Sequence, residues 1–133
     1  MTHPQQLPAP ASRHALSLLR FPDPRTDWVV VTVATLSQPV GLDLLTQRLS
    51  ALHQAVPVVG ARLRDEVWIS GAPPVIEMVD GGPLGSPGFD RPFELTSEAP
   101  LRVLLGSDQR RLVVIGHHAA FDGLALVAII AAL

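Results

Sequence analysis

Two adjacent histidines near the end of the sequence are the residues best suited to chemistry. The segment VVIGHHAAFDG places His117 and His118 directly after an apolar run. A neutral imidazole titrates close to physiological pH, so it can take a proton from an amine or a hydroxyl. Because adjacent residues at a strand end point to opposite sides, one ring can face a cleft while the other faces the interior. The pair therefore suggests a general base with a structural neighbour.

Asp122 and Gly123 follow the histidines and are better suited to shaping the loop than to catalysis. The carboxylate can pair with an arginine or cap the following helix, and the glycine permits close approach of the backbone. A metal site is a weaker interpretation, because adjacent histidines diverge and no third ligand is suitably spaced, so we expect no metal. A further alternative is a pair of ordinary buried histidines that are hydrogen-bonded to the backbone.

The elements that position this segment can be read from periodicity and turn residues. β-Branched residues indicate a buried strand over Trp28–Leu36. Leucines at helical spacing, followed by a proline, predict an amphipathic helix over Leu42–Ala55. The strands Leu101–Leu105 and Leu112–Ile115, joined by the turn GSDQRR, form a β-hairpin that leads to the histidines. The run GLALVAIIAAL after them has no polar face, which indicates a helix that is buried on all sides.

Shorter segments complete the predicted fold. Residues 1–12 are expected to be a flexible lead, followed by a single lobe over residues 13–133. His14–Phe21 is a short helix or strand, two short strands flank the turn Arg64-Asp65-Glu66, and Pro74–Val79 is a further strand. The stretch DGGPLGSPGFDRP is a loop. This order predicts a two-layer α/β (α+β) sandwich, in which helices cover one face of a mixed, largely antiparallel sheet.

Composition excludes several classes of function. The net charge is −2 and the arginines are scattered, so we expect no nucleic-acid partner. The absence of cysteine excludes disulfides and a thiol nucleophile. The polar N-terminus lacks a signal peptide, and histidines and an aspartate interrupt the apolar run near the end, so a cytoplasmic protein without membrane contact is expected. Apolar residues make up 47% and charged residues 17%, which suggests that another lobe or subunit covers part of the surface.

The pattern His-His-x-x-x-Asp-Gly at a strand-to-helix junction resembles the signature of the chloramphenicol acetyltransferase-like acyltransferases, which include the condensation domains of nonribosomal peptide synthetases. Two further phrases are similar to that superfamily and occur in the same order. They are LHQAVPVVGARL (Leu52–Leu63) and RPFELTSEAPLRVLL (Arg91–Leu105). The resemblance implies a chloramphenicol acetyltransferase-like lobe, and it covers most of the chain from Trp28 onward.

The resemblance also implies roles for individual residues. His118 would be the general base that deprotonates an amine or hydroxyl acceptor as it attacks a thioester on CoA or on a phosphopantetheine-linked carrier protein; no cofactor would be bound. His117 would be the structural histidine, Asp122 would hold the loop through an arginine, and Gly123 would keep the acceptor channel clear. The expected arginine is replaced by Gly60, and Arg62, on the same face of a strand, is the substitute candidate.

Chain length adds an expectation about partners. Condensation domains have two such lobes with the reaction between them, whereas chloramphenicol acetyltransferases form trimers of single lobes. We therefore expect a complementary lobe or subunit, and the very apolar last helix favours the N-terminal lobe of a two-lobe enzyme. The alternative function is a non-catalytic, condensation-like module that recruits a carrier protein or a partner enzyme.

Overall fold

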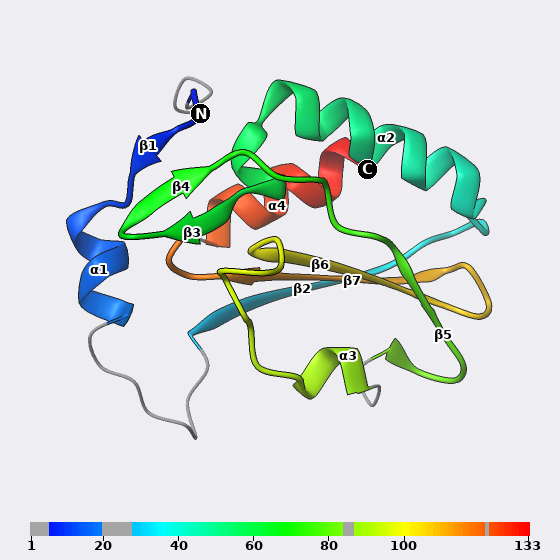
Figure 1. The fold of residues 1–133 in the computed structure, drawn as a ribbon. Helices are drawn as coiled ribbons and strands as arrows, with labels where there is room; N and C mark the ends of the chain where they lie inside the picture. Colours follow the sequence, from blue (N-terminus) through cyan, green and yellow to red (C-terminus); the bar gives the residue numbers. More distant parts are fainter. Residues whose placement is uncertain (1–5, 20–27, 84–86, 122) are drawn as a thin grey trace.

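The computed structural model describes residues 6–19, 28–83, 87–121 and 123–133. Helices α2 and α4 lie on one side of a central sheet and α3 lies on the other (Figure 1). The elements in chain order are β1 (Ala9–Pro10), α1 (Arg13–Leu19), β2 (Val29–Thr35), α2 (Leu42–Ala55), the 3-10 helix η1 (Pro57–Gly60), β3 (Arg62–Arg64), β4 (Val67–Ile69), β5 (Glu77–Val79), α3 (Pro87–Asp90), β6 (Leu101–Gly106), β7 (Arg111–His117) and α4 (Gly123–Ala132).

The central sheet has four strands in the order β2–β7–β6–β5. Strand β7 is antiparallel to both of its neighbours, whereas β5 runs parallel to β6. Gly116 pairs with Val30 of β2 on one side and with Leu101 of β6 on the other. The sheet is therefore mixed and largely antiparallel, as predicted, and its two inner strands are the predicted hairpin.

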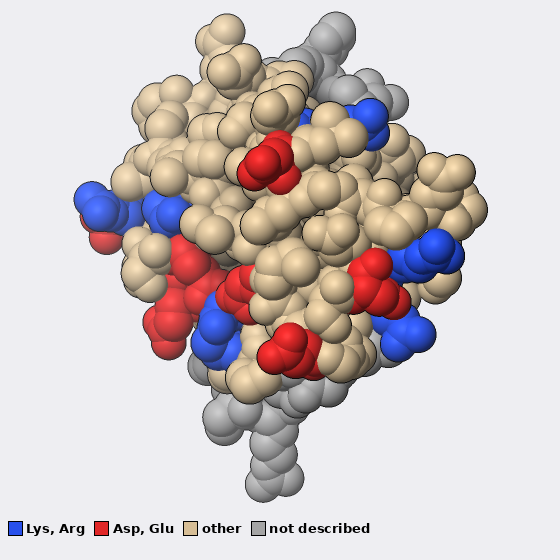
Figure 2. Space-filling model, turned by 90° about the vertical axis from the view of Figure 1, so that its right-hand side faces the viewer, with Lys and Arg blue, Asp and Glu red and all other residues tan. Residues whose placement is uncertain are grey.

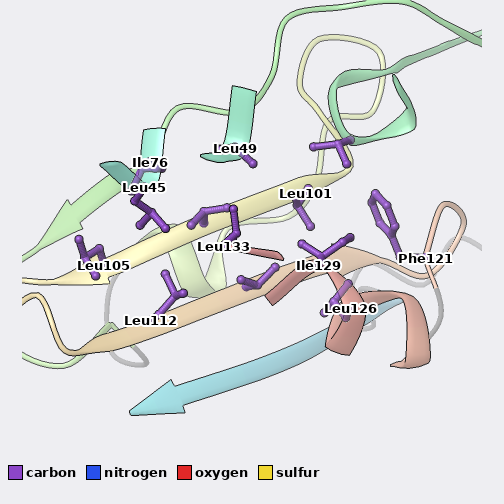
Figure 3. Packing of buried hydrophobic residues seen from close by; sticks show 13 residues of the cluster. Leu45, Leu49, Ile76, Leu101, Leu105, Leu112, Phe121, Leu126, Ile129 and Leu133 are labelled. Carbon is purple, nitrogen blue, oxygen red and sulfur yellow. The ribbon is translucent and has the colours of Figure 1, made fainter. Parts of the chain in front are cut away.

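The main hydrophobic core lies between this sheet and helices α2 and α4 (Figure 3). The helices contribute leucine and isoleucine side chains at helical spacing, and β6 and β7 contribute every second residue. Full burial of such a side chain contributes about 1.5–3 kcal/mol, so this layer dominates the stability of the lobe. The residues labelled in the figure are Leu45, Leu49, Ile76, Leu101, Leu105, Leu112, Phe121, Leu126, Ile129 and Leu133.

Two contacts fix α4 against its neighbours. A Cβ atom at Gly116 of β7 would lie 2.4 Å from Leu126 Cδ1, so the absence of a side chain there allows α4 to approach the strand. At the other end of α4, the guanidinium group of Arg48 on α2 donates a hydrogen bond of 2.9 Å to the carbonyl oxygen of Leu133. This bond satisfies a carbonyl that the helix itself leaves without a partner.

A smaller sheet, in the order β1–β4–β3, lies beside the main one. Its hairpin turns at Asp65 and Glu66, which both have positive φ angles (49° and 64°), as the tight turns of two-residue hairpins require. Strand β1 pairs with β4, and Ala11 donates its N–H to the carbonyl oxygen of Glu66 at 2.9 Å. Ala9 and Ala11 are buried, so this part of the segment expected to be a flexible lead is packed; residues 1–5 lie outside the described residues.

The second face of the main sheet has a lighter cover. Phe89 of α3 and Phe93 pack over Leu104, Val113 and Ile115. This cover includes the stretch that was predicted to be entirely loop, of which Pro87–Asp90 is in fact a short helix. Burial of two phenylalanines makes the turn of helix favourable despite the glycine and proline content of the stretch.

Most predicted elements are confirmed, but two burial predictions are wrong. The helix over Leu42–Ala55, the strand within Trp28–Leu36 and the strands on both sides of Asp65 occur as expected. However, β2 is an edge strand rather than a buried one, since no described strand pairs with its outer side. Helix α4 is not buried on all sides, because Leu124 and Val127 are 83% and 56% exposed.

Much of the face of the molecule that is drawn in Figure 2 is uncharged, and acidic and basic side chains are interspersed mostly over its lower half and toward its edges. No broad area of one sign forms on that face, in line with the net charge of −2. Among the helices of the described residues, none is long and apolar enough to cross a membrane.

Candidate active site

His117 ends β7 and points into the protein. It is only 5% exposed, and its ring lies edge-on against Phe93 with the ring centroids 5.7 Å apart. Its Nδ1 atom accepts a hydrogen bond of 3.1 Å from the backbone N–H of Ala119. Because Nδ1 is an acceptor, the proton of the neutral ring must be on Nε2, which fixes the tautomer. His117 therefore holds the start of the loop after β7, in line with a structural role.

His118 is the first residue after β7, and it is half-buried. Its backbone N–H donates to the carbonyl oxygen of Trp28 at 2.6 Å, so the edge strand holds it in place. The ring contacts the ring of His14 on α1, with centroids 5.4 Å apart and planes at 64°. Within the described part of the chain, Nδ1 of His118 is the buried side-chain atom that lacks a hydrogen-bond partner.

The two histidines thus diverge as the sequence predicts. One ring is locked among apolar side chains, and the other is partly open to solvent. A partly exposed imidazole in a fixed position is what a general base needs, because one ring nitrogen must reach the proton of an incoming group.

Arg62, the predicted support for the loop, makes its described bonds to backbone carbonyls. Its Nη1 atom donates to the oxygens of Gly60 at 2.7 Å and of Ala61 and Ala72 at 3.3 Å. These bonds join η1 to the segment after β4. Asp122 lies outside the described residues, so its pairing with Arg62 stays a prediction.

Gly60 is tightly packed, which explains why no arginine occupies this position. A Cβ atom there would lie 2.6 Å from His53 Nε2 and 2.8 Å from the carbonyl oxygen of Ala72. Gly71 approaches from the same side, and a Cβ on it would lie 2.5 Å from the Gly60 oxygen. An arginine at residue 60 would therefore displace both the helix α2 side chain and the adjacent backbone.

Gly123 begins α4 and is exposed. A Cβ atom there would meet nothing within 4 Å, so packing inside this chain does not demand a glycine at this position. The role of Gly123 beside an acceptor channel stays a prediction.

Sequence reasoning missed two residues that support the histidines. His14 lies in a segment whose structure was left open between helix and strand, and nothing in its spacing indicates a contact with His118. Arg102 is 5% exposed on β6, and its guanidinium lies 3.9 Å above the ring of Phe93, the same ring that contacts His117. The arginine in the middle of the apolar run LRVLL was a signal, because a charge in a buried strand needs a dedicated partner.

Arg102 finds such partners. It forms an ion pair of 2.8 Å with Glu98, donates to the carbonyl oxygen of Pro92 at 2.8 Å and also bonds the carbonyl oxygen of Arg91. The guanidinium thus ties the segment that carries Phe93 to β6. Since Phe93 packs against His117, this network holds in place the side chains that support the candidate site from inside the protein.

The described residues contain no group of three or more histidine, cysteine, aspartate or glutamate side chains that could hold a metal ion. Within these residues, the chemistry that the side chains around His118 offer is proton transfer by imidazole. The arrangement can accept a proton at one exposed ring nitrogen and hold the ring by its neighbours.

The fold is that of a lobe of the condensation domains, which the sequence resemblance implied. Three solved structures carry this conclusion. The complex of the X-domain and OxyB from teicoplanin biosynthesis matches with a TM-score of 0.76 and 18% identity over 99% of this chain and 34% of that one. The starter condensation domain of the rhizomide synthetase RzmA gives a TM-score of 0.73 and 13% identity over 96% and 36%. SgcC5 from Streptomyces globisporus gives 0.69 and 19% over 93% and 35%.

The chain spans about a third of the length of these solved structures. No protein-family profile matches the sequence, and no curated protein matches it. The likeness is therefore one of fold.

Proposed function

We propose that this chain is the N-terminal lobe of a condensation-type acyltransferase and that His118 is its general base. The observation that carries the proposal is the divergent histidine pair at the end of β7, with His117 locked inside and His118 half-buried. The acyl donor would be a thioester on CoA or on the phosphopantetheine arm of a carrier protein. The acceptor would be an amine or a hydroxyl.

The proposed acyl transfer needs no reactant beyond the thioester and the acceptor. As the acceptor nitrogen or oxygen bonds to the thioester carbon, its proton passes to Nε2 of His118. The carbon–sulfur bond then breaks, and the thiolate leaves and takes that proton from the imidazolium. Proton transfer of this kind contributes roughly 10²–10⁴-fold to the rate, and the positioning of the two substrates contributes much of the rest.

A second lobe or subunit is part of the proposal. The chain covers only about a third of the similar structures, and apolar side chains on β2, directly before it and on α4 are exposed in the chain by itself. These residues are Trp28, Val31, Val33, Leu124 and Val127. Exposed apolar residues in such number favour a partner surface over solvent.

The alternative function is a condensation-like module that does not catalyse but binds a carrier protein or a partner enzyme. Two observations favour it. The position of the expected arginine is a glycine that cannot be enlarged. One of the similar structures is itself a complex of an X-domain with OxyB. A lobe that keeps the fold without the expected arginine would suit recruitment.

The deciding experiment replaces His118 by alanine in the assembly of this chain with its complementary lobe or subunit. Acyl transfer is followed by mass spectrometry with an acyl-carrier or acyl-CoA thioester as donor and a panel of amines and alcohols as acceptors. We expect turnover to fall roughly 10²–10⁴-fold because the acceptor must then lose its proton without a base. His53→Ala, which removes an imidazole from α2, is the matched control and should keep most of the activity.

Unchanged turnover in the His118→Ala assembly would rule out the base role. A wild-type assembly that transfers no acyl group but binds the carrier protein, measured by calorimetry, would support the recruiting module instead. Binding that is equal in wild type and His118→Ala, with transfer lost only in the variant, supports the acyltransferase.

A further inference from the structure

The contact between His14 and His118 is unusual because a histidine from the N-terminal helix meets the candidate base from a segment more than a hundred residues later. The ring centroids are 5.4 Å apart and the planes meet at 64°. Two imidazoles joined by an N–H···N hydrogen bond of ordinary length have centroids about 5 Å apart. The observed spacing is therefore close to that of a hydrogen-bonded pair.

The His118 ring has a reason to form such a bond. Its Nδ1 atom is buried without a partner among the described residues. A neutral imidazole that uses Nε2 as the base must carry its proton on Nδ1. A buried N–H without an acceptor is unfavourable, so the base form of His118 requires an acceptor beside Nδ1.

Helix α1 is built to keep His14 in this place. The Oγ atom of Ser12 accepts a hydrogen bond of 3.0 Å from the N–H of Ala15, which caps the start of the helix. Ala15 is fully buried and belongs to the same apolar cluster as Ala119, the residue that follows His118. Strand β1 anchors the chain just before the helix, and Figure 1 shows α1 beside the loop that leaves β7.

We propose that His14 is a positioning residue for His118: one nitrogen of its exposed ring accepts the Nδ1–H hydrogen bond and holds His118 in the tautomer whose Nε2 is unprotonated. The bond needs only a rotation of the His14 side chain, which solvent leaves free to turn. The two neighbouring histidines then have opposite tautomers, since Nδ1 of His117 is an acceptor. The catalytic meaning of this pair rests on the proposed function, but the hydrogen bond itself does not.

The test is a long-range ¹H–¹⁵N correlation spectrum of the histidine rings in the 15N-labelled chain near neutral pH. We expect the Nδ1–H tautomer to be the major form of His118 in the wild type. It should no longer be the major form in His14→Phe, which keeps the ring contact but has no acceptor. His14→Asn and His14→Gln each provide a side-chain oxygen as acceptor, at the shorter and the longer of the two distances from the backbone at which the ring nitrogens of His14 lie. At least one of them should restore the Nδ1–H form. His117 is the internal control and should keep the Nε2–H tautomer throughout.

The same variants are then assayed for acyl transfer in the assembly, where His14→Phe should lower kcat with little change in KM. A His118 tautomer that is the same in wild type and His14→Phe would overturn the proposal, as would a failure of both amide variants to restore it. A tautomer that responds as expected in an assembly without acyl transfer would uphold the hydrogen bond and remove the proposed function.

Discussion

The centre and the edge of the main sheet are both rich in aliphatic side chains but differ in how far they bury them. At the centre, every residue of β6 is buried, and β7 is buried from Leu112 to His117. At the edge, β2 is richer in valine than either central strand, yet Val31 and Val33 are 37% and 47% exposed. Helix α4 lies over β2 and shows the same division, with Leu126 buried and Leu124 exposed.

The difference shows that residue type determines which side chains of a segment could be buried, whereas the neighbouring elements determine which of them are buried. The central strands have a partner on both sides and a layer on both faces. Among the described strands the edge strand has one partner, and the cover of α3 does not include Val31 and Val33. The candidate base lies where the two regions meet, since His118 follows the central β7 and is bonded to Trp28 before the edge strand.

The largest effect is expected from truncating neighbouring residues of α4. Leu126→Ala removes a fully buried side chain from the core and should lower the free energy of unfolding by about 2–5 kcal/mol. Val127→Ala, one position further on, removes an exposed side chain and should change it by less than about 0.5 kcal/mol. Urea denaturation of both variants measures the difference. Equal losses would mean that α4 has no distinct inner and outer faces.

A smaller effect is expected from adding a methyl group to two glycines. Gly116→Ala forces a Cβ atom into contact with Leu126 and Phe121, and should cost about 1–3 kcal/mol. Gly123→Ala adds its methyl group in open space at the start of α4, and should leave the chain unchanged or about 0.4–1 kcal/mol more stable. Thermal unfolding separates the two, and a stabilised Gly116→Ala would contradict the close packing of α4 on β7.

The smallest effect is expected at the exposed turn between the central strands. The backbone N–H groups of Arg110 and Arg111 donate to the carboxylate of Asp108 at 3.0 and 3.3 Å. The bond from Arg110 is the main reason that the pKa of Asp108 lies below the ordinary value of 3.8. A lowered folded-state pKa stabilises the fold above the unfolded pKa, and that stability is lost as the pH falls through the folded pKa. Asp108→Asn should therefore weaken the dependence of stability on pH below about 4.

The matched control for this change is Asp65→Asn in the turn between β3 and β4. Asparagine tolerates the positive φ of 49° at that position, so the variant should keep the acid dependence of the wild type. Urea unfolding midpoints measured between about pH 5 and about pH 2.5 give the comparison. The same slope in Asp108→Asn and wild type would show that the turn carboxylate does not stabilise the fold.

Much of the fold could be predicted from local patterns. Leucines at helical spacing located α2 between Leu42 and Ala55, and turn residues located the hairpin of β6 and β7. What could not be predicted was which valine-rich strand lies at the edge, because β2 and β7 have similar composition and strand order depends on distant pairing. For the same reason the outer face of α4 could not be told from its inner face.

The candidate site was predicted in part. Divergence of His117 and His118 follows from strand geometry, and in the structure the two rings contact different neighbours, Phe93 and His14. The contact with His14 and the support of Phe93 by Arg102 join residues far apart in the sequence, and no periodicity marks such contacts. The roles of Asp122 and Gly123 in a loop clamp and an acceptor channel stay predictions.

The pairing of β2 with β7 also determines how the chain can be divided. Among the described strands, β7 is the sole neighbour of β2, and Val29 near the beginning is opposite His117 near the end. A cut at any point between Thr35 and Arg111 therefore leaves β2 on one fragment and its partner on the other. The smaller sheet adds a second tie, since β1 pairs with β4 in mid-chain. The segment over residues 29–118 is thus the shortest one that keeps the edge strand, the hairpin and the histidine pair together.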